Sequence, residues 1–327
     1  MPYDHLENKK ELIEKVGIPE DDIFDYSVND PYKVVEQFFQ FCQQNLSEEC
    51  GQYDIQPALI YIRGKMDVNA AAGKGKDYYV IRVNFGTIVI MFRLYTDHHH
   101  IFEEKALADF FHLNKSLDES LDYLLFQVSM QFTFYHERAH LIQKSPETHH
   151  WIDESYNLNP EDSPFSLRNH LYEFDADLHA SSLIAFHLID YWKKQTETIR
   201  TEQNLRLIIS IGLAGIVSYF IFLKRNYTKV FYKAGTHPHP LVRISYIVDN
   251  LIKTVEGNID GEISFESKEV LKNSFRIVEQ LFSAAQTPWL QDFINDFYAE
   301  QKNIEQYVNE VLIAESVNVP ELTLNRK

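Results

Sequence analysis

The sequence has little cysteine, glycine or proline, and these shortages exclude several classes of protein. Its 327 residues include two cysteines, Cys42 and Cys50, too few for a disulfide scaffold or a cysteine-based zinc or iron–sulfur site. Glycine and proline number 11 each, which excludes collagen-like and linker-rich architectures. Two isolated cysteines are typical of reduced thiols in a cytoplasmic protein.

Positive charge is also scarce, because 31 Lys and Arg residues are set against 48 Asp and Glu residues, a net charge of −17 at pH 7. A surface this acidic repels phosphate backbones and anionic membranes, so nucleic acid and membrane are poor partners. The N-terminal residues contain no apolar stretch of the kind that a secretory signal needs. We therefore expect a cytoplasmic protein with a packed core, since 45% of its residues are apolar.

The N-terminal third combines helices and strands. Apolar spacing predicts short amphipathic helices at 6–17 and 31–48. Residues 57–66 and 77–84 are rich in β-branched and aromatic side chains, and a Gly-Lys-Gly-Lys sequence at 73–76 lies between them. This pattern predicts a β-hairpin.

From Ser116 onward the sequence is helical, so the expected fold class is α+β, mainly α. A Ser-Leu-Asp-Glu sequence opens a helix that runs to about Lys144, and a loop follows at 145–169. Further helices are expected near 169–194, 201–225, 238–254, 265–285 and 291–315. We divide the chain into an N-terminal α+β region at 1–110, a core at 111–254 and a C-terminal helical region at 255–327.

An HExxH motif, His136-Glu137-Arg138-Ala139-His140, lies inside the helix predicted from Ser116. Residues i and i+4 share a helix face, so both imidazoles can reach one zinc ion. Glu137 is one residue further on, where its carboxylate can address a metal-bound water. The motif predicts a zinc site with Glu137 as general base.

The next predicted helix carries Glu173-Phe174-Asp175-Ala176-Asp177, beginning 33 residues after His140. A catalytic zinc site needs a third protein ligand, with the fourth position left for water, and Glu173 can supply that ligand. Asp177 lies one turn later on the same face, where it can accept a hydrogen bond from a ligand histidine and fix its tautomer. His170 is an alternative third ligand.

A third motif is Thr236-His237-Pro238-His239-Pro240-Leu241-Val242-Arg243-Ile244. We expect Thr236 to cap a helix whose first turn holds a proline. His237 would then stand at a helix N-terminus, and together with Arg243 it can stabilise an oxyanion or a carboxylate.

HExxH, ExxAD and THPxxxxRI, in this order over residues 116–250, resemble the gluzincin metallopeptidases of the HtpX and CaaX-prenyl-protease type, and most of all the Lit family of phage-exclusion peptidases. The resemblance implies a gluzincin-like helical zinc-peptidase core, with His136, His140 and Glu173 as zinc ligands and Glu137 as general base. It implies that Asp177 supports the metal ligands and that His237 and Arg243 are catalytic residues that contact the transition state. It also implies an endopeptidase that cleaves a selected intracellular protein, in antiphage defence, through attack of zinc-bound water.

Residues 207–223 form a run of 17 without a charge, which suits either a short membrane span or a buried core helix. A span would place Glu173 and His237 on opposite sides of a bilayer, so we expect a buried helix.

Two other functions stay open. One is a non-catalytic or conditionally activated metal-binding interaction protein. The other is a di-iron bundle, which would need His170 beside Glu173. The substrate, the activating trigger and the oligomeric state are not encoded in any motif.

Overall fold

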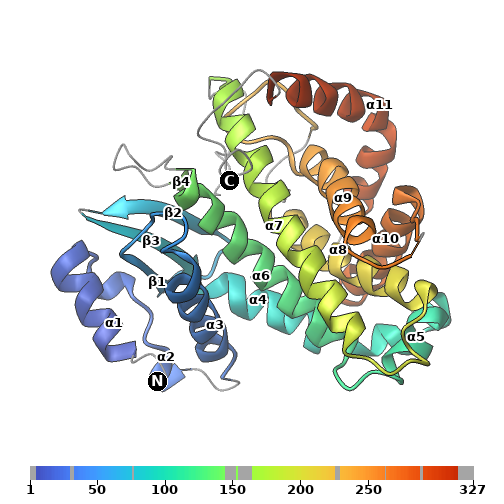
Figure 1. Ribbon diagram of the computed structural model, residues 1–327, viewed down its shortest axis with the longest axis horizontal. Helices are drawn as coiled ribbons and strands as arrows, with labels where there is room; N and C mark the ends of the chain where they lie inside the picture. Colours follow the sequence, from blue (N-terminus) through green and yellow to red (C-terminus); the bar gives the residue numbers. More distant parts are fainter. Residues whose placement is uncertain are drawn as a thin grey trace. The chain divides into compact units, whose positions relative to one another are not determined.

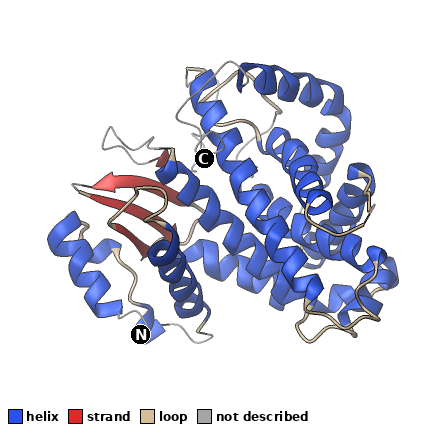
Figure 2. Cartoon of the chain, viewed as in Figure 1, coloured by secondary structure: helices blue, strands red, loops and turns tan. Residues whose placement is uncertain are grey.

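The computed structural model describes residues 5–29, 33–75, 77–143, 152–153, 164–224, 229–261, 263–287 and 290–315 (Figure 1). These residues are mostly helical and include one small sheet, as expected for a mainly α member of the α+β class (Figure 2). They form two compact units. Of the described residues, the first unit holds those up to 92 and those from 133 to 153, and the second holds those at 93–132 and 164–315.

The sheet of the first unit has the strand order β1-β3-β2-β4. Its strands are β1 (Ala58–Arg63), β2 (Ala70–Gly75), β3 (Tyr78–Asn84) and β4 (Ile152–Asp153). β3 pairs in parallel with β1 and antiparallel with β2, and β4 adds to the free edge of β2.

The predicted hairpin is therefore wrong in its pairing. Residues 57–66 and 77–84 do contain strands, but these run parallel, and the hairpin is formed by β2 and β3. Gly73-Lys74-Gly75 belongs to β2 rather than to a turn. The Ala and Gly residues of β2 have low strand propensity, so this strand is selected by pairing and burial between its neighbours.

Helices complete the first unit. They are α1 (His5–Glu11), which continues into a π-helical turn η1 (Leu12–Val16), a short η2 (Glu20–Asp22), α2 (Tyr26–Asn29), α3 (Val34–Glu49) and most of α4 (Phe85–Thr96). α3 packs on β1. A hydrophobic cluster joins the N-terminal helices to one face of the sheet through Leu12, Val16, Ile23, Leu59, Tyr61 and Val80.

The second unit is a helical bundle. It contains η3 (His99–Glu103), η4 (Lys105–Leu107), α5 (Ala108–Asn114), α7 (Leu167–Lys193), α8 (Glu202–Lys224), α9 (Pro240–Gly257), α10 (Ser267–Ala284) and α11 (Leu290–Glu315). α7 packs against α8 and α9, and α10 packs against α8 (Figure 1). α6 (Leu121–Ile142) contributes its residues up to Phe132 to this unit and the rest to the first.

The helix that carries HExxH begins later than predicted. It starts at Leu121 rather than Ser116, and the backbone N–H of Leu121 donates to Oδ1 of Asn114 at 2.8 Å. An asparagine seven residues upstream therefore satisfies an N–H that the expected Ser-Leu-Asp-Glu cap was to serve. The strand β4 lies inside the segment predicted to be a loop.

The apolar run forms α8, the one helix among the described residues that is long and apolar enough to cross a membrane. Of its most apolar 18-residue window, 89% is buried inside the protein, as in a core helix. Its glycines allow close packing, since a Cβ at Gly215 would lie 2.8 Å from the carbonyl oxygen of Leu125 on α6. The hydroxyl of Ser129 donates to the carbonyl of Gly215 at 2.9 Å.

Candidate metal centre

The two histidines of HExxH lie one turn apart near the end of α6 and point the same way. The Nε2 atoms of His136 and His140 are 3.0 Å apart, and both side chains are buried. Their ring planes are perpendicular, with centroids 4.6 Å apart. Two imidazole nitrogens that converge in this way can share one cation, as the i, i+4 spacing predicts.

Gln143 sets the tautomer of His140. Its side-chain oxygen lies 2.9 Å from Nδ1 of His140, in a buried contact. An amide oxygen only accepts hydrogen bonds, so Nδ1 carries the proton and donates it. In the neutral ring Nε2 is then a lone-pair donor, which is the form that a metal ligand needs.

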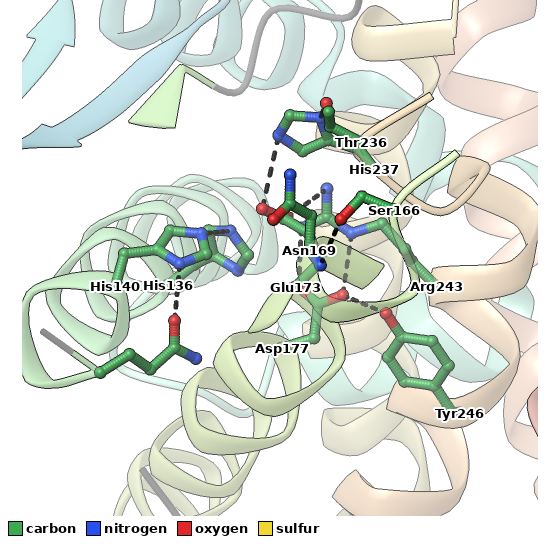
Figure 3. A network of polar contacts seen from close by, with 11 residues as sticks. His136, His140, Ser166, Asn169, Glu173, Asp177, Thr236, His237, Arg243 and Tyr246 are labelled. Carbon is green, nitrogen blue, oxygen red and sulfur yellow. Dashed lines mark hydrogen bonds and ion pairs between the residues drawn. The ribbon is translucent and has the colours of Figure 1, made fainter. Parts of the chain in front are cut away.

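Glu173, on α7, completes a group that can hold a metal ion. One ligand atom each from His136, His140 and Glu173 lies within 4.8 Å of the others, and all three residues are buried (Figure 3). Two imidazoles and one carboxylate are a donor set found in catalytic zinc sites. The residues predicted to be ligands thus fit a divalent cation by chemistry and by proximity, and in the part of the chain that is described they are the one group that does so.

The carboxylate of Glu173 faces two cationic or potentially cationic side chains of its own unit. Nε2 of His237 lies 3.4 Å from its Oε1, and Nη1 of Arg243 lies 3.6 Å from its Oε2. His237 is 11% exposed, whereas Arg243 is fully buried. Arg243 therefore gives a buried carboxylate a permanent positive neighbour.

Asp177 and Arg243 form the most buried ion pair of this region. Nε and Nη2 of Arg243 donate to Asp177 at 2.8 and 2.7 Å, and the hydroxyl of Tyr246 donates to Oδ2 at 2.6 Å (Figure 3). Burial, together with the negative charge of Asp177, raises the pKa of Tyr246 far above its usual range, so the phenol stays a donor. Asp177 therefore binds and orients Arg243. From the sequence we expected it to accept a hydrogen bond from a ligand histidine instead. The neighbour found for His140 is Gln143.

His237 lies further from the start of its helix than the sequence predicted. α9 starts at Pro240, and its N-cap is His239, whose Nδ1 accepts from the N–H of Leu241 at 3.1 Å. The proposed cap, Thr236, instead contacts Nδ1 of His237 at 2.9 Å through its hydroxyl. His237 is thus a loop residue whose ring is oriented by its neighbour and whose Nε2 points to Glu173.

His170 takes no part in the group of three. Its Nδ1 is 2.7 Å from the hydroxyl of Tyr307, and the ring is fully buried. The alternative in which His170 replaces Glu173, and the di-iron arrangement that needs both, therefore lack support from the geometry. The His98-His99-His100 run lies at the start of η3, where His99 and His100 are exposed.

Glu137 and Arg138 lie between the two histidines in the sequence, and both side chains are fully buried. The guanidinium of Arg138 pairs with Glu49 at the end of α3 and lies over the ring of Tyr135, 4.9 Å from its centroid. This pair was missed in the sequence because its members are 89 residues apart. Gln143 was missed as well, although its i+3 spacing from His140 was a usable signal.

Comparisons with protein families, with curated proteins and with solved structures give no match. The function proposed below therefore rests on the residues, their geometry and the motif resemblance. The geometry supports a group that could hold a metal ion.

Proposed function

We propose that this protein is a zinc-dependent endopeptidase of the gluzincin kind. The observation that carries the proposal is the buried group of His136, His140 and Glu173, with Glu137 directly after the first ligand. The order of the three motifs, which resembles the HtpX, CaaX-protease and Lit peptidases, favours peptide hydrolysis over other zinc chemistry.

Zinc fits the donor set better than other common divalent ions. Imidazole and carboxylate ligands in a set of three suit tetrahedral zinc with one open position, whereas Mg²⁺ and Ca²⁺ prefer oxygen ligands throughout. When bound, zinc would polarise the scissile carbonyl and lower the pKa of water to about 7.

The protein's own side chains then transfer the proton, position a ligand and contact the substrate. Glu137 takes a proton from the attacking water and delivers it to the leaving amine, the usual work of a general base that turns acid. Arg243 holds the carboxylate of Glu173 in place, since it contacts both that carboxylate and Asp177. His237, whose side chain is 11% exposed, is the most exposed of these groups, so it is the one suited to meet the substrate oxyanion.

The substrate class follows from the resemblance and from charge. We propose a selected intracellular protein as target, in the manner of the phage-exclusion peptidases. The net charge of −17 disfavours acidic targets and nucleic acid, because like charges slow encounter.

Metal content tests the centre directly. Purified protein should hold about one zinc per chain by mass spectrometry of the metal, and His140→Ala should hold almost none, because two protein ligands are too few. His99→Ala, which removes an exposed histidine, is the matched control and should keep the metal. Equal zinc in His140→Ala and wild type would contradict the proposal.

New protein N-termini test the reaction. Cells that express the wild type should contain cleavage products that are absent from cells expressing Glu137→Gln, while both proteins bind zinc equally. If the two proteomes are identical and zinc is bound, the chain is a metal-binding interaction protein and the peptidase proposal fails.

A further inference from the structure

The C-terminal helix α11, to which no sequence motif gives a role, contacts the loop that leads to His237. The hydroxyl of Tyr232 donates to Oε2 of Glu300 at 2.8 Å. Nζ of Lys233 lies 2.7 Å from Oε2 of Glu310. Two consecutive loop residues are therefore tied to positions about three helical turns apart on α11.

A buried contact continues this connection toward the metal centre. Tyr307 of α11 packs its ring edge-on against Tyr232 at 5.8 Å, and its hydroxyl meets Nδ1 of His170 at 2.7 Å. Tyr307 is 4% exposed and His170 is fully buried. His170 lies one turn before Glu173 on α7, so α11 touches the same turn of α7 that supplies the carboxylate.

The loop is also fixed from α7. The N–H of Ser166, which caps α7, donates to the carbonyl of Gly235 at 3.3 Å. Gly235 has a φ of 67°, a left-handed conformation that glycine adopts without strain. Burial lowers the pKa of His170, whereas hydrogen bonding with the backbone of Ala234 and Gly235 acts in the opposite direction, which places both loop residues beside this ring. His170 thus stands between Tyr307 and the loop.

We infer that α11 is a positioning element that holds the 229–239 loop so that the imidazole of His237 meets Glu173. The inference rests on the proposed function for the role of His237, whereas the holding of the loop is independent of it. Tyr307 and His170 form the buried part of the connection, and Tyr232 is partly buried beside them. Lys233–Glu310 is an exposed pair and contributes little, because exposed ion pairs are screened by water.

The test removes two hydroxyls and leaves both rings. Tyr232→Phe combined with Tyr307→Phe deletes the bonds to Glu300 and His170 but keeps the ring packing. Tyr298→Phe on α11, 54% exposed, makes the same chemical change away from the loop and is the control. Circular dichroism melting of all variants confirms that the bundle still folds.

Hydrogen exchange of the metal-free protein gives the first readout. Amides at 229–239 should exchange roughly tenfold faster in the double variant, since two hydrogen bonds are lost. In the double variant, amides in α9 should exchange at the wild-type rate. In Tyr298→Phe, amides at 229–239 should do the same. Unchanged exchange of the loop would overturn the inference, and because no activity is measured this outcome does not depend on the peptidase proposal.

A double-mutant cycle with His237 gives the second readout. Once a cleaved protein is known, the two tyrosine changes should lower kcat/KM about tenfold in the wild-type background. In the His237→Ala background they should change it less than about twofold, because the loop then has no imidazole to present. Equal losses in both backgrounds would overturn the positioning of His237. Absence of any cleavage, with faster loop exchange, would refute the peptidase function and support α11 as the element that holds the loop.

Discussion

The side-chain oxygen of Gln143 lies 2.9 Å from Nδ1 of His140, at the point where α6 ends. This one contact decides which nitrogen of His140 carries the proton. It leaves Nε2, 3.0 Å from Nε2 of His136, as the atom that could hold a metal ion. A residue outside every motif therefore orients a candidate metal ligand inside one.

Replacing Gln143 with Leu should weaken zinc binding by about ten- to a hundredfold, since loss of a partner behind a ligand histidine has effects of that size. Competition with a chromophoric chelator measures the affinity. Gln127→Leu, on the half-exposed face of the same helix, should not change it. If both variants bind zinc like the wild type, the tautomer argument is refuted.

The ion pair of Asp177 and Arg243 should contribute strongly to folding. Asp177→Ala leaves a buried guanidinium with one carboxylate neighbour fewer, and breaking one partner of such a pair costs about 3–5 kcal/mol. Urea unfolding in the presence of a chelator measures this without a contribution from metal. Asp190→Ala, an exposed change on the same helix, is the control. A loss below about 1 kcal/mol in Asp177→Ala would contradict the role given to this pair.

Most helices were predictable from sequence, because apolar spacing acts locally, although α6, which carries HExxH, starts at Leu121 rather than at Ser116. α7 (Leu167–Lys193) and α11 (Leu290–Glu315) lie within about two residues of their predicted bounds. The predicted hairpin was wrong because strand pairing is not local. β2 is rich in alanine and glycine, and only its neighbours identify it as a strand.

The proximity of the two histidines could be predicted for the same local reason. Glu173, on another helix, was suggested by the order of the motifs, and the supporting contacts were not predicted. His136 and His140 share a helix face by their spacing alone. Tyr307 and His170 are separated by 137 residues, and Arg138 and Glu49 by 89, so no periodicity relates them. Such pairs follow from the packing of whole helices, which a single sequence does not display.

Glu49 and Arg138 give a third prediction, within the first unit. Glu49→Gln keeps the shape but removes the charge that the buried guanidinium contacts, so stability should fall by about 2 kcal/mol. Because Glu49 is partly exposed, water limits the loss. Glu48→Gln, an exposed neighbour, should stay within about 0.5 kcal/mol of the wild type in the same urea titration. Equal stability of the two variants would show that Arg138 does not need its partner.

His170 should make stability depend on pH. Burial, and then the charge of His237, lower the pKa of His170 from 6.5 to about 4 in the folded protein. In the unfolded chain this ring takes up a proton near pH 6.5, so the folded state loses stability as the pH falls from about 6.5 to about 4, and loses no more from this group below that.

The full effect of this shift is about 3 kcal/mol, since one pKa unit corresponds to about 1.4 kcal/mol. Chemical unfolding of metal-free protein at several pH values should show that His170→Gln has a shallower pH dependence than the wild type across this window. His99→Gln, which changes an exposed histidine, should follow the wild type. Parallel curves for wild type and His170→Gln would mean that the ring is protonated equally in both states, and its neutral contact with Tyr307 would then be refuted.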